Sequence, residues 1–247
     1  MKVSILTVVY NGAATIRSCI DSVLQQDYTD IEYIIVDGNS SDGTQEIVQS
    51  YGDKIAQFLS EPDSGIYDAM NKAIKLATGD IIGILNADDF YAFPSVISLV
   101  AETMSANACQ AVYGDLEYIL PGNEAVVKRK WISGQYRKGA FYYGWMPPHP
   151  TFFVRREVYE QHGMFRLDLG SAADYELMLR FVHKAELTIG YIPRVLVRMR
   201  AGGVSNSTFS NRLKANRSDR LAWEMNGLKP HFYTLWLKPL RKIKQFL

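Results

Sequence analysis

The sequence predicts an α/β protein with a mostly parallel sheet flanked by helices. Short apolar segments alternate with segments of helical periodicity through the first ninety residues, which is typical of strands joined by crossover helices. The expected strands are continuous apolar runs, as found in sheets that are buried on both faces. The length of 247 residues suits one large domain or a domain with a small appendage.

The individual elements follow from these patterns. Strands are expected at 3–9, 31–36, 55–59 and 81–85. Helices are expected at 14–26, from Ser41 or Asp42 through 48, and at 66–77. The second half is less regular. Its expected elements are a small antiparallel meander at 111–113, 116–120 and 125–130, a long loop at 131–150, a strand at 151–154, and helices from 156, at 174–184 and at 209–223.

Composition excludes several classes of protein. The formal net charge of +1 gives no reason to expect nucleic acid as a partner. Cys19 and Cys109 are the only cysteines, so a disulfide framework or zinc site is not expected, and a reducing compartment is. No apolar run approaches the roughly 20 residues of a membrane-spanning helix, and the N-terminal run is too short for a signal peptide. We expect a cytoplasmic protein that is soluble or bound at the inner face of the plasma membrane.

Polar clusters follow three of the expected strands: 10–11, 37–39 and 86–89. The carboxyl ends of parallel strands share one edge of a sheet, so these clusters should meet in one crevice. Asp88 and Asp89 are suited to Mg²⁺ or Mn²⁺, hard ions held by one or two carboxylates together with substrate phosphates. A capping or turn role for Asp89 before the next helix is the alternative.

Further candidate residues each have a structural alternative. Asp37 suits hydrogen bonding to a nucleobase or ribose, or an Asx turn. Tyr10 suits stacking on a base, or packing. Ser64 and Gly65 precede a helix, where they form an anion site or a plain N-cap. The sequence has no dinucleotide-binding glycine motif, P-loop or serine-hydrolase elbow.

Several blocks of sequence, in fixed order, resemble family-2 inverting glycosyltransferases over about residues 1–205. They are SILTVVYNGAATIRSCIDSVLQQ, EYIIVDGNSSDGT, SEPDSGIYDAMNKAIKLATGDIIGILNADD and HPTFFVRREVYEQHGMF. The similarity is strongest to bacterial enzymes that assemble capsule, exopolysaccharide and O-antigen. It implies a GT-A-type, Rossmann-like fold and a nucleotide-sugar donor, commonly a UDP-sugar.

The resemblance also implies roles for residues. It places Thr7, Tyr10 and Asp37 around the nucleoside. The full predicted nucleotide-binding set comprises Thr7, Val9, Tyr10, Asp37, Ser64, Gly65, Asn71 and Ala87. The resemblance makes NADD the counterpart of the D-x-D metal motif, with Asp88 as the metal-side carboxylate and Asn86 in place of the first Asp. The general base is Asp174, with Glu176 as a rival because Ala173 replaces a Glu common in relatives. Apart from the resemblance, His149 is a candidate for contact with the acceptor or a phosphate, and its alternative is a hydrogen-bonded loop residue, which a lone His after prolines more often is.

The predicted enzyme is a glycosyltransferase of the hexosyltransferase type with a lipid-linked or saccharide acceptor. It is expected to add a single sugar, because the Q-x-x-R-W signature of processive synthases is missing. The predicted division is a nucleotide-sugar half at 1–110, an acceptor half at 111–205 and a helical extension at 206–247. This extension mixes Phe, Trp and Leu with Lys and Arg, which suits either an anionic membrane surface or a helix that covers the domain's own core. The alternatives are a sugar-nucleotide nucleotidyltransferase and a non-catalytic nucleotide-sugar-binding protein.

Overall fold

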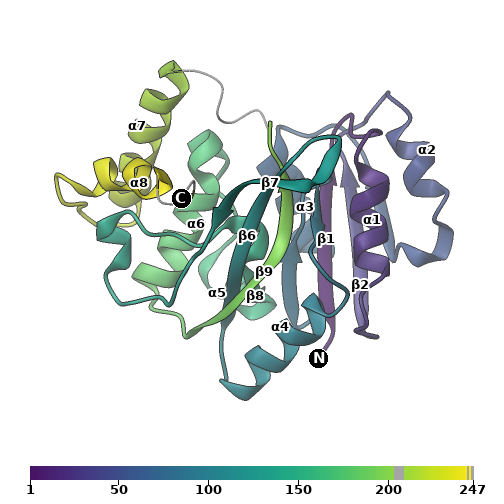
Figure 1. Cartoon of the computed structure of the whole chain (residues 1–247), viewed down its shortest axis with the longest axis horizontal. Coiled ribbons are helices and arrows are strands. Elements are labelled where there is room, and N and C mark those ends of the chain that lie inside the picture. The colour runs from purple at the N-terminus through teal and green to yellow at the C-terminus, as the bar shows by residue number, and fades with distance from the viewer. Residues whose placement is uncertain (203–208, 244, 246–247) are drawn as a thin grey trace.

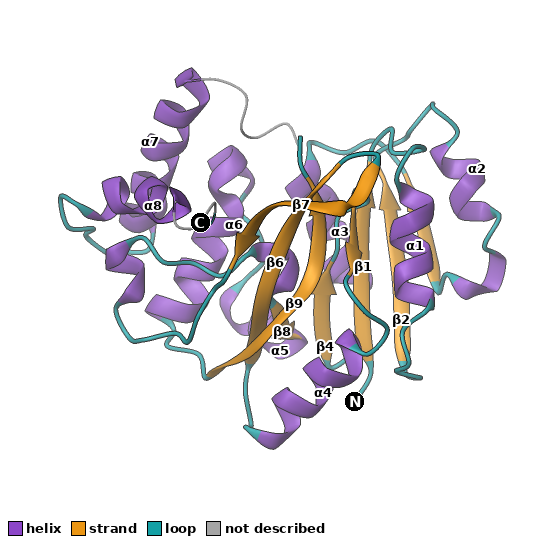
Figure 2. Ribbon diagram, in the orientation of Figure 1, coloured by secondary structure: helices purple, strands orange, loops and turns teal. Residues whose placement is uncertain are grey.

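The structure is a computed structural model, and it describes residues 1–202, 209–243 and 245. Within this part of the chain, nine strands form a single mixed sheet with helices on both faces (Figures 1 and 2). The strands are β1 (Val3–Val9), β2 (Ile31–Asp37), β3 (Gln57–Ser60), β4 (Ile81–Ile84), β5 (Asp89–Tyr91), β6 (Ala111–Leu120), β7 (Asn123–Trp131), β8 (Phe153–Arg155) and β9 (Ile189–Arg200). Their order is β3-β2-β1-β4-β8-β6-β9-β5, with β7 paired to β6 outside this path.

The helices connect and cover the strands. They are α1 (Ile16–Leu24), α2 (Thr44–Gln49), α3 (Ile66–Leu76), α4 (Val96–Ala106), α5 (Arg156–His162), α6 (Ala173–Met178), α7 (Phe209–Met225) and α8 (Thr234–Ile243). Shorter helical turns are η1 (Gly52–Lys54), η2 (Ala140–Tyr143), η3 (His149–Thr151), η4 (Leu167–Ala172) and the π-helical η5 (Leu179–Lys184). The mostly parallel sheet with flanking helices predicted from the sequence is confirmed.

The N-terminal half follows the predicted alternation. β1 pairs in parallel with β2 and β4, and β2 with β3, so the carboxyl ends of these strands lie on one edge. Every residue of β1 is buried, and successive side chains enter opposite faces of the sheet. Ile5 packs with the residues of α1 and α4, whereas Leu6 packs with those of α3. The strand predicted at 55–59 begins two residues later than expected.

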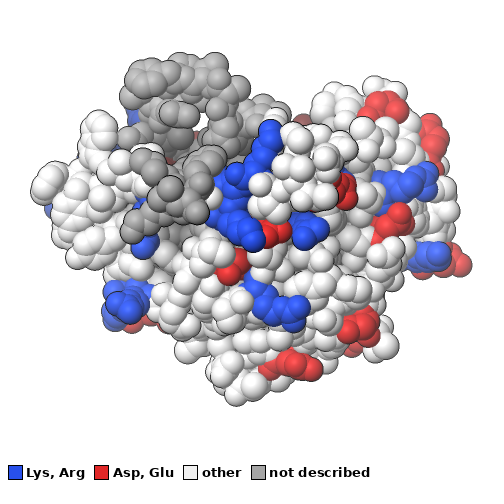
Figure 3. All heavy atoms as spheres, viewed as in Figure 1, with Lys and Arg blue, Asp and Glu red and all other residues white. Residues whose placement is uncertain are grey.

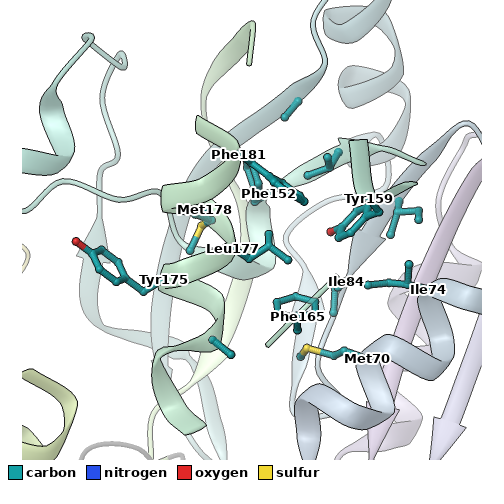
Figure 4. Close-up of a cluster of buried hydrophobic side chains, with 14 of the residues drawn as sticks. Met70, Ile74, Ile84, Phe152, Tyr159, Phe165, Tyr175, Leu177, Met178 and Phe181 are labelled. Atoms are coloured by element: carbon teal, nitrogen blue, oxygen red, sulfur yellow. The ribbon is translucent and has the colours of Figure 1, made fainter. Parts of the chain in front are cut away.

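The second face of the sheet carries the larger core. In Figure 4, Met70 and Ile74 of α3 and Leu177 of α6 lie around Phe165, while Tyr175 points away from this cluster. α6 therefore has two buried sides. Because η5 continues α6, the helix predicted at 174–184 is present, although its second half is π-helical.

The C-terminal half contains the predicted antiparallel part, although β6 also pairs in parallel with β9. β6 and β7 form a hairpin whose turn is Pro121–Gly122, where Gly122 has φ of 80°. Glycine adopts this left-handed conformation without steric cost, and proline before it fixes the turn. β6 is one continuous strand where two were expected. β8 runs antiparallel between β4 and β6 and joins the two halves.

The C-terminal helices pack on the rest of the protein. Trp223 of α7 is fully buried, and its Nε1 donates a hydrogen bond of 2.8 Å to the Tyr175 hydroxyl. Thr234 and Leu235 of α8 are buried as well. None of the described helices is both long enough and apolar enough to cross a membrane.

Candidate active site

The polar clusters after β1 and β2 meet, as predicted. The backbone N–H of Asn11 donates to Ser40 Oγ at 2.7 Å, and that of Ser41 donates to Asn11 Oδ1 at 3.0 Å. A Cβ on Gly38 would lie 2.6 Å from Asp63 Oδ2 and 3.4 Å from a Tyr10 ring carbon, so glycine permits this close approach. The loops after β1, β2 and β3 therefore form one continuous wall at the carboxyl edge of the sheet.

The end of β4 joins this wall through small side chains. A Cβ on Gly12 would lie 2.6 Å from Val9 Cγ2 and 3.7 Å from Ala87 Cβ. Val9 and Ala87 are both buried, so their side chains form the floor beneath the loops. The three clusters thus share one edge.

The side chains of the predicted nucleotide-binding set differ in how accessible they are to a ligand. Tyr10 is 69% exposed and offers a free aromatic face. The Thr7 hydroxyl is fully buried and lies 3.1 Å from the Tyr33 hydroxyl. The Asp37 carboxylate is also buried and accepts hydrogen bonds from Ser40 N at 2.9 Å, from Ser60 Oγ at 2.7 Å and from Ser40 Oγ. The turn-supporting alternative for Asp37 is therefore observed, and its contact with a nucleoside stays a prediction.

The start of α3 is closed by the protein's own carboxylates. The N–H of Ser64 donates to Asp68 Oδ2 at 3.0 Å, and that of Gly65 donates to Asp63 Oδ1 at 2.7 Å. These two N–H groups are the ones predicted to receive an anion, so a phosphate would have to displace the carboxylates.

Asn71, one of the predicted nucleotide contacts, uses its side-chain amide for hydrogen bonds within the protein. Its Nδ2 donates to the Phe165 carbonyl, and its Oδ1 accepts from the Phe165 N–H, both at 2.9 Å. This geometry gives Asn71 a structural role, in which it clamps the loop before η4 onto α3. A direct contact of Asn71 with a nucleotide stays untested.

The turn after β4 carries unsatisfied oxygen atoms. Asp89 is fully buried, and within the described residues its Oδ1 has no hydrogen-bond partner; nor has Asn86 Oδ1. A single long contact of 3.4 Å joins Asn86 Nδ2 to Asp89 Oδ2. Burial and the charge of Asp88 raise the pKa of Asp89 well above its usual range, against the opposing effects of Asn86 and Arg200.

These atoms fit a divalent cation. Buried oxygen atoms without donors cost free energy, and a hard cation would satisfy them. Groups of three or more His, Cys, Asp or Glu side chains suited to a metal are absent from the described residues. Asp88, Asp89 and Asn86 would therefore hold the ion with help from substrate phosphate and water, which is the usual arrangement for Mg²⁺.

Arg200, at the end of β9, braces this turn. Its guanidinium donates to the Asp88 carbonyl at 2.8 Å and to Ser18 Oγ at 3.0 Å, and it pairs with Glu124 in the β6–β7 hairpin. Arg200 was not predicted from the sequence, because its contacts with Ser18, Asp88 and Glu124 span 76 to 182 residues of chain and leave no local pattern.

Asp174 lies in the first turn of α6, after Ala173. Burial raises the pKa of Tyr67. The charge of Asp174, and a hydrogen bond between the Asp174 side chain and the Tyr67 hydroxyl, raise this pKa further. Burial raises the pKa of Tyr118, and the charges of Asp89 and Asp174 act in the same direction. The sequence analysis also missed Tyr67; its position one helical turn before Asn71 is the signal that would have found it.

His149 packs on Phe165, the ring that Tyr67 also contacts. Its ring packs edge-on to Phe165 with centroids 5.5 Å apart, and Tyr67 packs on Phe165 at 5.4 Å. Burial lowers the pKa of His149, although the charge of Asp174 opposes this. A neutral imidazole would offer a hydrogen bond to an acceptor rather than a positive charge to a phosphate, and its role stays a prediction.

Glu176, the rival base, is committed elsewhere. It is almost fully buried, and its carboxylate accepts from Arg180 at 2.9 and 3.0 Å and from Asn226, the residue after α7, at 3.0 Å. Arg180 also donates to backbone carbonyls after α5, including that of Met164 at 2.7 Å. Glu176 therefore ties α6, α7 and the 162–164 segment together.

Comparison with known proteins identifies the family of this chain. The profile of the family described as "Glycosyl transferase family 2" matches residues 4–163, more than half of the chain. This chain belongs to that family. An uncharacterised glycosyltransferase of Mycobacterium tuberculosis is 30% identical to it over 186 residues, which cover 72% of this chain and 68% of the relative.

Solved structures show that the fold of this glycosyltransferase is GT-A-like, as the resemblance implied. Staphylococcus aureus TarS in complex with UDP-GlcNAc matches with a TM-score of 0.72 and 18% identity, over 91% of this chain and 66% of that one, so this chain spans slightly less than two thirds of the TarS fragment. The mannosyltransferase PcManGT of Pyrobaculum calidifontis, in complex with GDP-Man and Mn²⁺, matches with a TM-score of 0.69 and 20% identity, over 96% of this chain and 72% of that one.

Proposed function

We propose that this glycosyltransferase moves one sugar from a nucleotide-sugar, a UDP-sugar, to a hydroxyl of a bacterial surface polysaccharide intermediate, with inversion at the anomeric carbon. The observation that carries the proposal is the pair of buried, unsatisfied oxygen atoms on Asn86 and Asp89, at the edge of the sheet. Family membership supports glycosyl transfer over nucleotidyl transfer and over non-catalytic binding.

On this proposal, Asn86, Asp88 and Asp89 hold Mn²⁺ or Mg²⁺ against the donor diphosphate. When bound, the ion supplies charge stabilisation for the departing nucleoside diphosphate, on the order of several kcal/mol. The chain's own contribution is a turn braced by Arg200 and a floor formed by Val9 and Ala87, which keep these oxygen atoms in place. PcManGT, a structural relative, has Mn²⁺ in its complex with GDP-Man.

Asp174 is the proposed general base. It is partly exposed, whereas the carboxylate of Glu176 already accepts three hydrogen bonds. As the acceptor oxygen bonds to the anomeric carbon, the bond to the diphosphate breaks and the hydroxyl proton passes to Asp174. A positioned base of this kind contributes roughly 10²–10⁴ in rate. Tyr67 and His149, which both pack on Phe165 and whose pKa values both respond to the charge of Asp174, would orient it and the acceptor.

Donor recognition is proposed at the wall formed by the loops after β1, β2 and β3. The exposed Tyr10 ring would stack on the base, beside the Asp37 turn and the start of α3. The acceptor is proposed to be a lipid-linked saccharide presented at the inner face of the plasma membrane. The missing processive signature supports the addition of a single sugar.

The decisive experiment separates Asp174 from Glu176. Free UDP release would be measured with Mn²⁺ and a panel of UDP-sugars for wild type, Asp174→Asn and Glu176→Gln, alongside donor binding and thermal stability. Asp174→Asn should bind donor normally and lose about 10²-fold or more in turnover. Glu176→Gln should lose mainly stability. A stable, donor-binding Glu176→Gln protein without activity would show that Asp174 is not the base.

A further inference from the structure

One face of α8 is fixed to the protein. Thr234 and Leu235 are 1% and 5% exposed, and Lys238 Nζ donates to Asp219 Oδ2 of α7 at 2.7 Å. The same ammonium group lies 3.6 Å from the centroid of the Tyr175 ring. A Cβ on Gly144 would lie only 2.4 Å from the backbone nitrogen of Lys238, so the helix backbone packs directly on the 131–150 loop. α8 is therefore held in a defined orientation.

The opposite face of α8 carries large apolar side chains exposed to water. Phe232, Trp236 and Leu240 are 87%, 69% and 55% exposed, and their four-residue spacing places them in one row along the helix and the turn before it. Tyr143, 58% exposed, stacks on Tyr233 beside this row with centroids 6.0 Å apart. We refer to Tyr143, Phe232, Trp236 and Leu240 as the α8 patch. An exposed apolar cluster of this kind marks an interaction site.

Basic residues border the α8 patch. Lys229 and Arg241 are exposed at its two ends. On the other side of α8, a hollow of about 280 Å³ lies between the helix and β7, with Lys130, Trp131, Ile132, Met146, Lys238 and Arg241 among its lining residues. Figure 3 shows Lys and Arg side chains gathered over β7, the strand that supplies Lys130. The patch thus combines apolar and aromatic side chains with a cationic border.

We propose that the α8 patch docks this glycosyltransferase on the surface of an anionic membrane. Phe232, Trp236 and Leu240 enter the boundary between headgroups and acyl chains, and the basic border faces lipid phosphates. This is the composition of helices that lie in the membrane interface, where Trp and Tyr are favoured. The proposal goes beyond the proposed function, because it does not depend on the chemistry at Asp88 or Asp174.

Charge argues against a second copy of the chain as the occupant. A two-fold symmetric contact through the α8 patch would bring each basic border against its own copy, and like charges would then face each other. An anionic bilayer instead complements the border. The anchoring of α8 also supports membrane docking, because the row of apolar side chains can insert into the bilayer without further folding of the helix.

The test is vesicle flotation of the full chain. Wild type should float with vesicles of phosphatidylcholine and phosphatidylglycerol, and less with phosphatidylcholine alone or at high salt. The double variant Trp236→Ser, Leu240→Ser should lose about ten-fold or more in membrane partitioning. Leu221→Ser, which removes an exposed leucine of α7 outside the patch, is the matched control and should float like wild type.

A second measurement does not depend on folding of the double variant. Brominated lipids should quench tryptophan fluorescence of wild type, and most of this quenching should disappear in Trp236→Phe. Flotation that is unchanged in the double variant, absence of wild-type flotation, or self-association of wild type that the double variant abolishes would overturn the proposal. Thermal shifts induced by UDP-sugar, measured on the same proteins, report separately on the proposed function.

Discussion

Two fully buried carboxylates lie at the carboxyl edge of the same sheet, and they differ in how well they are satisfied. Asp37, at the end of β2, accepts hydrogen bonds from Ser40 and Ser60, including the backbone N–H of Ser40. Asp89, after β4, has one contact at 3.4 Å and an oxygen atom without a described donor. Burial alone therefore does not distinguish a structural carboxylate from one that awaits a ligand; the number of its donors does.

The largest expected effect is on catalysis, at the turn after β4 that carries Asp88 and the unsatisfied Asp89. Asp88→Ala should lower turnover by about 10²–10³-fold or more, because it removes a carboxylate that would hold the ion against the leaving group. Mn²⁺-dependent UDP release measures this. Asp30→Ala, at an exposed carboxylate far from the edge, is the control. Wild-type rates in Asp88→Ala would reject the metal assignment.

A second satisfied carboxylate extends the comparison to pH. Burial raises the pKa of Glu32, but hydrogen bonds from Lys2, Ser4 and Thr78 outweigh it and lower the pKa from 4.5 to about 2. Its contribution to stability is therefore full above the unfolded-state pKa and lost as the pH falls towards about 2. Glu32→Gln should lower the free energy of unfolding by about 2–3 kcal/mol at neutral pH and by less in acid. Urea denaturation at several pH values checks this, and a difference that did not shrink in acid would contradict it.

Binding of a metal ion at Asp89 should stabilise the folded protein. Mn²⁺ at about 100 times its Kd should stabilise wild type by about 2.7 kcal/mol, an effect that Asp89→Asn should remove. Because the pKa of Asp89 is raised, the ion must displace a proton, and its affinity should fall as the pH is lowered. Thermal denaturation with and without Mn²⁺ measures both effects. Equal stabilisation of Asp89→Asn would place the ion elsewhere.

The smallest effect is expected at Asp37. Asp37→Asn keeps the shape but weakens the bonds from Ser40 and Ser60, so it should cost about 1–2 kcal/mol of stability. Affinity for Mn²⁺, measured by titration, should stay as in wild type. If Asp37→Asn were as stable as wild type but failed to bind a UDP-sugar, the comparison would break, because Asp37 would then serve the ligand rather than the turn.

Much of the fold and part of the site followed from local pattern. Continuous apolar runs located β1, β2 and β4 because a sheet covered on both faces needs apolar side chains on both sides of each strand. Parallel topology then brought the polar ends of these strands to one edge. The long-range contacts could not be predicted in this way. The hydrogen bonds from Arg200 to Asp88 and from Asn71 to Phe165 join segments that no sequence periodicity relates.

The sequence by itself determined which oxygen atoms, rings and carboxylates reach the edge of the sheet, because the points where strands end and the alternation of side chains along them are local properties. Only the tertiary structure decided which of them are already satisfied. Glu176 meets Arg180 and Asn226, and Asp37 meets its serines, while Asn86 and Asp89 keep oxygen atoms without a described donor. The physical reason is that a buried polar atom finds its partner in three dimensions, often from a distant part of the chain.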